Sequence, residues 1–205
     1  MKMNLSEMQM DALREVGNIG ASHAADSLST MIDGRVDITV PNIQIQKIGN
    51  LEETLSEKNP GKRFLFTMEG EARSAIVLNF TQESASILGS YLTLGDPNPP
   101  EDIDEETKEM MASAIQEVAN ILVSSTADAF AALLDIRMDI SVPISMDSLR
   151  EGIEKEGLGA DLNPDVIVFD TMLKSEILAV STNMYFLPFK RTMEPLLEKL
   201  GVANL

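Results

Sequence analysis

Residues 11–41 read DALREVGNIGASHAADSLSTMIDGRVDITVP, and residues 113–143 read SAIQEVANILVSSTADAFAALLDIRMDISVP, at a constant offset of 102 and without a gap. Fourteen positions between 11 and 43 are identical to their partners 102 residues later. A repeat of about half the chain is too long for a solenoid unit, so it predicts a duplicated half-domain. The repeat also keeps Glu and Asn, which the packing of a hydrophobic core does not explain.

Each half is predicted to contain a long helix, strands that include a hairpin, and a closing helix. In the first half we expect a helix at 5–32 capped by Ser6, a strand at 36–40 that Pro41 ends or offsets, a polar loop at 49–62, hairpin strands at 64–68 and 74–80, and a helix at 81–94. In the second half we expect a helix at 104–134, a strand at 138–142 ending at Pro143, a short charged helix after Asp147, hairpin strands at 166–173 and 177–189, and a helix at 192–200.

The length suits one domain or two small ones, and the repeat favours one because each half alone is short. A proline-rich segment at 95–102 joins the halves. We predict a single domain over residues 1–205, with repeat 1 at about 5–95 and repeat 2 at about 104–201. The expected fold class is α/β in two layers: pseudo-two-fold duplicated half-domains share a mixed or antiparallel sheet, with two long helices on one face.

Composition excludes several classes of function. The net charge of −17 repels phosphate backbones, so no nucleic-acid partner is expected; it suits a protein with a basic rim, although solubility alone also explains it. One His and no Cys exclude thiolate sites and sites built from several histidines. No signal-peptide run and no stretch of roughly 18 apolar residues is present, so we expect a cytoplasmic protein without membrane insertion.

The repeated polar residues fall on one narrow side of each long helix because they are spaced by four, three and four positions. The first such stripe is Asp11, Glu15, Asn18 and Ser22, and its twin is Ser113, Glu117, Asn120 and Ser124. Apolar residues occupy the opposite side, so both stripes should face solvent. A single Glu-x-x-Asn on a helix is common, and shared ancestry alone could retain two. Because exposed polar positions usually drift first, two copies in register favour a function.

The chain resembles the CheC/CheX/FliY phosphatases of bacterial and archaeal chemotaxis, because Asp/Ser-x3-Glu-x2-Asn-x22-Pro is their signature and occurs twice. Two copies in 205 residues resemble CheC members more than CheX or the longer FliY. The resemblance implies hydrolysis of the aspartyl phosphate of phosphorylated CheY. Asn18 and Asn120 would orient the attacking water, and Glu15 and Glu117 would dock the partner's lysine. It implies no cofactor on this chain, with Mg²⁺ carried by the response regulator.

The resemblance also implies supporting residues and a second partner. Asp11 and Ser113 would support the helix surface, and Pro41 and Pro143 would end strands. The receptor deamidase CheD is the second expected partner, with Asp147 as an interface residue; a helix N-cap is the alternative role of Asp147. Two alternative functions stay open: a non-catalytic regulator of CheD, and a flagellar-switch component, against which the lack of an appended domain counts.

Overall fold

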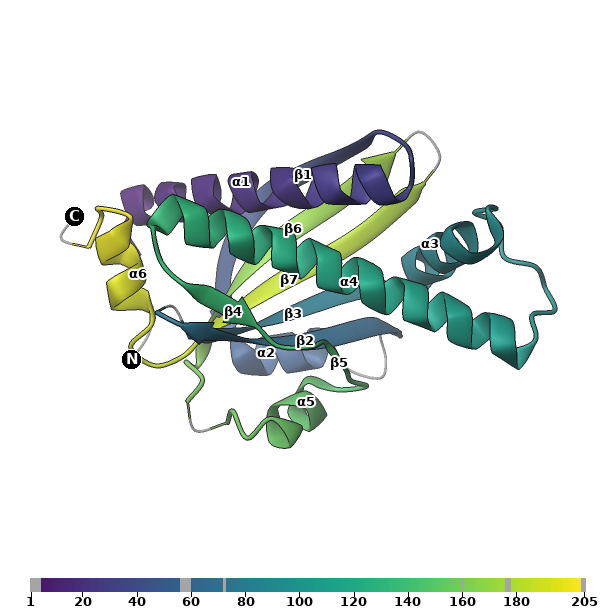
Figure 1. Cartoon of the computed structure of the whole chain (residues 1–205). Coiled ribbons are helices and arrows are strands. Elements are labelled where there is room, and N and C mark those ends of the chain that lie inside the picture. The colour runs from purple at the N-terminus through teal and green to yellow at the C-terminus, as the bar shows by residue number, and fades with distance from the viewer. Residues whose placement is uncertain (1–4, 56–59, 72, 160, 176–177, 204–205) are drawn as a thin grey trace.

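Two long antiparallel helices cross one face of a single sheet (Figure 1). The computed structural model describes residues 5–55, 60–71, 73–159, 161–175 and 178–203. The helices are α1 (Glu7–Met31) and α4 (Glu105–Leu134). Among the described residues, every strand pairing is antiparallel. The predicted α/β class with two long helices on one face is confirmed, and the sheet is antiparallel.

A capping box begins α1. The Ser6 hydroxyl accepts a hydrogen bond from the Gln9 N–H at 3.2 Å, and the Gln9 side chain accepts one from the Ser6 N–H at 2.9 Å. These bonds satisfy backbone groups that a helix start otherwise leaves without partners. On the opposite side from the polar stripe, Leu13, Val16 and Leu28 are buried. This apolar side holds α1 on the sheet, and the predicted first helix is confirmed.

The second long helix, α4, is capped at both ends by aspartates. The Asp104 carboxylate accepts a hydrogen bond from the Thr107 N–H at 2.7 Å, and Asp135 ends the helix in a left-handed conformation with φ of 50°. By length and composition α4 could also cross a membrane, since its most apolar 18 residues have a mean hydropathy of 1.3. Half of that window is buried inside the protein, which is the behaviour of a core helix.

We expect the first turn of α4 to lose protection in acid. Hydrogen bonds from the Thr107 side chain and backbone hold the pKa of the Asp104 carboxyl below its ordinary value. The contribution of this charged cap is therefore present above the unfolded pKa of about 3.9 and is lost as the pH falls through the lower folded value. Protection factors of the Thr107 and Lys108 amides should fall relative to mid-helix amides as the pH is lowered from about 6 to about 3.

The control for this experiment is Asp104→Asn, whose amide oxygen caps the helix without titrating. In this variant, protection of the first turn should not change with pH across the same window. Equal acid sensitivity in the unmodified protein and in Asp104→Asn would show that the cap does not cause the effect.

The order of strands in the sheet is symmetric. The strands are β1 (Val36–Lys47), β2 (Gly61–Gly70), β3 (Ser74–Thr81), β4 (Met138–Ile140), β5 (Ile144–Ser145), β6 (Asp165–Ser175) and β7 (Ala179–Pro188). They follow the order β1-β6-β7-β3-β2-β4, and β5 also pairs with β2. Exchanging β1 with β4, β2 with β6 and β3 with β7 reverses this order onto itself. A two-fold relation between the halves requires such an order, with β3 and β7 at the centre.

Both repeated prolines interrupt strand pairing. Strand β1 does not end at Pro41 but continues past it, and its register with β6 shifts between Thr39 and Asn42. An edge strand tolerates this shift and the missing N–H. In the second half, Pro143 lies in a break between β4 and β5, so the strand predicted at 138–142 is shorter than expected.

Two short helices, α2 (Ile48–Thr54) and α5 (Leu149–Lys155), cover the other face of the sheet. Leu51 and Leu149 bury in an apolar cluster with residues of β2, β3, β6 and β7 that point away from α1 and α4. The prediction of a polar loop at 49–62 is therefore wrong over α2. Its apolar positions are too few to show a helical period in the sequence.

The N-cap of α5 is Ser148 and not Asp147. The Ser148 hydroxyl accepts a hydrogen bond from the Glu151 N–H at 3.2 Å. The Asp147 backbone carbonyl accepts one from Arg63 Nη1 at 2.7 Å, and the residue is exposed. The capping role considered for Asp147 is wrong, because the serine one position later satisfies the helix start.

The remaining elements agree with the sequence. Helix α3 (Gln82–Leu94) begins at Thr81, whose hydroxyl accepts from the Ser84 N–H, and ends at Gly95 with φ of 76°. Helix α6 (Met193–Lys199) is the last helix of the described residues. The final hairpin is β6 and β7, and the predicted strand start at residue 177 lies outside the described residues.

Candidate functional site

The first polar stripe lies on the exposed side of α1. Asp11, Glu15, Asn18 and Ser22 are all exposed. The Ser22 hydroxyl donates to the Asn18 backbone carbonyl at 2.9 Å, a bond that closes on the helix and leaves the Asn18 side chain free. The surface that the stripe presents is therefore a carboxylate and an amide one helical turn apart.

The second stripe lies on the exposed side of α4. Ser113 and Glu117 are exposed, whereas Asn120 and Ser124 are half-buried. Glu117 is thus exposed like Glu15, whereas the Asn120 side chain is less exposed to solvent than that of Asn18. The first stripe has the exposure that its spacing predicts, and the second has it at Ser113 and Glu117 but only in part at Asn120 and Ser124.

The Glu and Asn side chains of both stripes have no partner among the residues that the structure describes: Glu15, Asn18, Glu117 and Asn120. Polar groups on a helix surface often bond to neighbours three or four positions away. These four instead keep their full hydrogen-bonding capacity for water or for another molecule.

The first stripe has two carboxylates and the second has one, but the neighbouring Arg14 compensates the difference. Asp11 forms an ion pair with Arg14 on the surface of α1. At the equivalent positions of α4, 102 residues later, stand the neutral Ser113 and Gln116. The ion pair and the neutral pair both sum to zero, so the Glu of each stripe supplies its one net negative charge.

Two glycines seat α1 closely beside the first stripe. A Cβ on Gly17 would lie 2.7 Å from the ring of Phe169 in β6, and a Cβ on Gly20 would lie 2.8 Å from Thr126 Cγ2 and 3.0 Å from Phe130 Cε1 in α4. Neither glycine therefore leaves room for a side chain. Gly17 lets α1 approach β6 closely, and Gly20 lets it approach α4 closely, so the two glycines fix the position of the helix that carries the first stripe.

The two stripes lie toward opposite ends of the helix pair. Gly20 packs on Thr126 and Phe130, and Ser27 Oγ lies 2.7 Å from Ser125 Oγ, so the helices run antiparallel and cross near residues 24 and 126. Each Asn lies six residues before the crossing, on the opposite side of it from the other. At 1.5 Å per residue, the two amides are roughly 20 Å apart. Each stripe therefore forms its own surface.

An exposed methionine extends each stripe toward the helix start. Met8 is 54% exposed on α1 and Met110 is 47% exposed on α4. They stand 102 residues apart and three positions before Asp11 and Ser113, respectively. Neither was predicted from the sequence, because the repeat as defined above begins at residue 11. Identity between the halves at residues 7 and 8 is the signal that would have found them.

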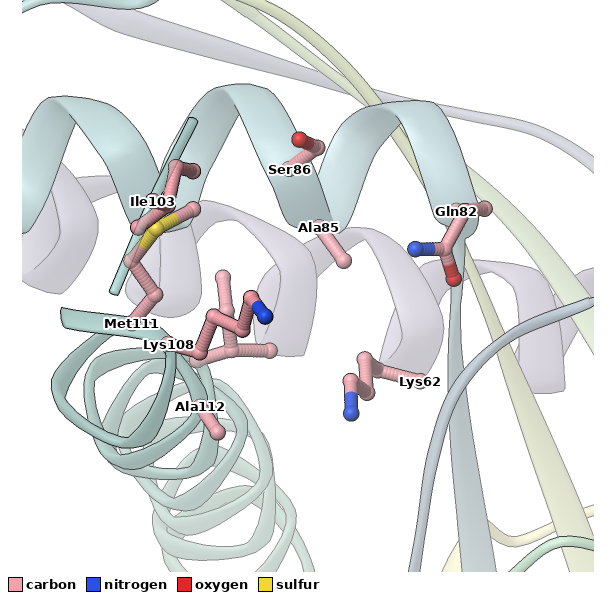
Figure 2. Close-up of a pocket in the computed structure, with 9 residues that line it drawn as sticks. Lys62, Gln82, Ala85, Ser86, Ile103, Lys108, Met111 and Ala112 are labelled. Carbon is pink, nitrogen blue, oxygen red and sulfur yellow. The ribbon is translucent and has the colours of Figure 1, made fainter. Parts of the chain in front are cut away.

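A pocket of about 290 Å³ lies between α3 and the start of α4, away from the stripes. Figure 2 shows Lys62, Gln82 and Lys108 around it. Its lining residue Met111 is two positions from Ser113, which places them about 160° apart around the helix axis. The concavity is therefore not part of either stripe. No cluster of three or more metal-binding side chains occurs among the described residues.

The remaining predicted site residues lie apart from the stripes. Pro143 is half-buried beside β2, and the side chain of Pro41 lies outside the described part of the chain. Asp147 precedes α5, which covers the opposite face of the sheet from α1 and α4. The structure thus groups Asp11 with Glu15 and Asn18, and Ser113 with Glu117 and Asn120, but brings neither proline nor Asp147 to them.

The fold is similar to those of solved chemotaxis and flagellar proteins. The structure matches that of Thermotoga maritima FliY with a TM-score of 0.74 and 24% identity, over 98% of this chain and 100% of that one. It also matches a CheX–CheY–BeF3–Mg²⁺ complex from Borrelia burgdorferi with a TM-score of 0.54 and 16% identity, over 84% of this chain and 97% of that one. At these identities the likeness concerns the arrangement of helices and sheet.

Sequence similarity extends over the whole chain. The chain is 30% identical over 208 residues to the CheY-P phosphatase CheC of Bacillus subtilis (strain 168), and the alignment covers 97% of each protein. The model of the CheC-like family matches residues 8–45 and 110–146, two segments that begin 102 residues apart and contain the two stripes. The chain therefore belongs to the CheC-like family.

Proposed function

We propose that this protein hydrolyses the aspartyl phosphate of a phosphorylated CheY response regulator. The observation that carries the proposal is a Glu and an Asn without partners among the described residues on each long helix: exposed Glu15 with exposed Asn18, and exposed Glu117 with half-buried Asn120. The similar Bacillus subtilis protein, named a CheY-P phosphatase, supports the choice of substrate.

Asn18 and Asn120 are proposed to position the attacking water. Hydrolysis of an aspartyl phosphate needs a water molecule in line with the phosphorus and the leaving oxygen, while Mg²⁺ on the receiver domain stabilises the charge of the phosphoryl group. An amide is not a useful base, but its oxygen accepts and its NH₂ donates, so it can hold a water in one orientation. A CheX of the same fold was solved with CheY, Mg²⁺ and BeF3, which stands in for the phosphoryl group.

Glu15 and Glu117 are proposed to dock the partner. Each carboxylate lies three positions before its Asn, which places the two side chains about 5–6 Å apart on one helix face. A lysine at the phosphorylation site of the response regulator would donate a charge-assisted hydrogen bond to this carboxylate. That bond would set the amide over the phosphoryl group, so docking and water placement depend on one rigid helix.

Catalytic turnover tests the proposal most directly. A CheY response regulator phosphorylated with a small-molecule phosphodonor is mixed with about one-twentieth of its concentration of this protein, and phosphate release is followed after the donor is removed. Phosphorylated CheY should lose its phosphate several-fold faster than by spontaneous hydrolysis, without an initial burst. The added rate should be proportional to the amount of protein. A decay unchanged by the protein would exclude phosphatase activity.

Binding of CheD is the second candidate function, and the observation that favours it is the exposure of Asp147. Because Ser148 caps α5, the exposed Asp147 carboxylate is not needed as the cap of this helix. We propose that it contacts CheD on the face of the sheet opposite the stripes. CheD binding is measured separately with the purified proteins; binding by a protein that releases no phosphate in the turnover assay would favour this regulatory function over catalysis.

A further inference from the structure

Met8 and Met110 are exposed at equivalent places on the two stripes. Five large apolar side chains are exposed among the described residues: Met8, Leu94, Met110, Leu133 and Val142. Two of these five occupy one position of the repeat. Neighbouring methionines behave differently: Met10 and Met31 of α1 pack against the core, whereas Met8 does not. Core packing therefore gives no reason for an apolar residue at this position.

The methionines continue the proposed sites along the helix. Met8 precedes Glu15 by seven residues, which is two helical turns, so both side chains point to the same side. From Met8 to Asn18 the stripe is about 15 Å long at 1.5 Å per residue, and the same holds from Met110 to Asn120. One small domain can cover that length in a standard interface.

We propose that Met8 and Met110 are apolar anchors that bind the response regulator beside its phosphorylation site. The partner's identity rests on the proposed function; the docking surface rests on the exposure and repetition of the methionines. Each methionine lies among acidic neighbours, Glu7 and Asp11 on α1 and Glu106 and Glu109 on α4. An apolar centre with a charged rim is the usual anatomy of an interface, and an unbranched thioether adapts its shape to a partner.

Charge favours a different protein over a second copy of this chain as the occupant. The chain has a net charge of −17, and the stripes themselves are negative, so two copies would bring like charges together. An anionic membrane surface is disfavoured for the same reason. A partner that presents a lysine beside an apolar patch satisfies both parts of the stripe.

The anchor is tested one site at a time. In a background of Glu15→Ala and Asn18→Ala, only the α4 stripe keeps its Glu and Asn, and Met110→Gln is added. We measure kcat and KM with phosphorylated CheY, and Kd with CheY bound to BeF3 and Mg²⁺. KM and Kd should rise about fivefold to tenfold, with kcat within about twofold, because Met110 contributes binding and does not touch the reacting atoms. Met110→Leu should restore both constants.

The matched control is Leu133→Gln in the same background. Leu133 is on the same helix and is 46% exposed, against 47% for Met110, but it lies outside the stripe and 13 residues beyond Asn120. Its KM and Kd should stay within about twofold of the background. The reciprocal test places Met8→Gln in a background of Glu117→Ala and Asn120→Ala, with the same expected effect.

Three outcomes separate the possibilities. Unchanged KM and Kd in the Met110→Gln and Met8→Gln variants would overturn the inference while leaving phosphatase activity intact. Sedimentation of the protein alone is measured as well. If the methionine variants changed its oligomeric state but not the Kd for CheY–BeF3–Mg²⁺, the methionines would serve self-association, and the inference would be overturned. Methionine-dependent binding of CheY–BeF3–Mg²⁺ by a protein that releases no phosphate would support the inference and reject the proposed function.

Discussion

Replacing both stripe amides, Asn18→Ala with Asn120→Ala, is expected to lower kcat for dephosphorylation of CheY by about 100-fold or more. The reason is that a misplaced nucleophile costs on the order of two decades in rate even when the rest of the site is intact. KM should change little, because the carboxylates that dock the partner remain. Each single variant should retain the activity of the other site, since the amides are roughly 20 Å apart along antiparallel helices. Initial rates of phosphate release, measured over a range of phosphorylated CheY concentrations up to saturation, give both constants.

A matched control for the amide substitution is Asn50→Ala. Asn50 is an exposed residue of α2, on the opposite face of the sheet, and it contributes its backbone carbonyl to a bond with Thr54. The same chemical change there should leave kcat and KM unaltered. A double variant at Asn18 and Asn120 that matched the unmodified protein would show that the amides do not position the water.

Adding a methyl group at Gly17 or Gly20 is expected to destabilise the fold. The Gly17 methyl would overlap the Phe169 ring, which is itself packed edge-on against Phe130 with centroids 6.5 Å apart. Overpacking of this kind costs about 1–3 kcal/mol, and the higher helix propensity of Ala returns at most about 1 kcal/mol. Gly17→Ala should therefore lower the free energy of unfolding by about 1–2 kcal/mol, measured by urea denaturation. Gly20→Ala should behave alike, because Thr126 and Phe130 crowd it.

Gly49→Ala is the control for both glycine substitutions. Gly49 lies in α2, and a Cβ there would have no neighbour within 4 Å. The substitution should leave the stability unchanged or raise it by up to about 1 kcal/mol through helix propensity. If Gly17→Ala were as stable as Gly49→Ala, the close packing of α1 would not be what retains these glycines.

Elements with strong local signals could be predicted from the sequence. The long helices follow from their uninterrupted period and from the caps at Ser6 and Asp104, and α3 follows from Thr81 and Gly95. Helix α2 could not be predicted in this way. It is too short to be stable alone, and it is stabilised by the burial of Leu51 against the sheet. The break at Pro143 likewise depends on pairing with β2, a partner about 75 residues away that no local pattern reveals.

The candidate site was more predictable than the strand ends, because it lies on one face of one kind of element. Helical spacing alone placed Glu15 with Asn18 and Glu117 with Asn120 on the exposed side. Spacing could not show that Asn120 sits lower than Asn18, because that depends on how neighbouring side chains pack around α4. Met8 and Met110 carried no chemical signal, since a methionine in a helix is more often part of a core.

The pairing of β1 with β6 has a consequence for how the chain is made. On the ribosome, β1 emerges first, but its hydrogen-bonding partner is more than 100 residues further along. The first half can form its hairpin of β2 and β3. Until β6 is made, the backbone N–H and C=O groups of β1 lack their strand partner and can pair with other chains. Assembly of the sheet is thus deferred until synthesis is nearly complete, so both stripes become available for their partner together.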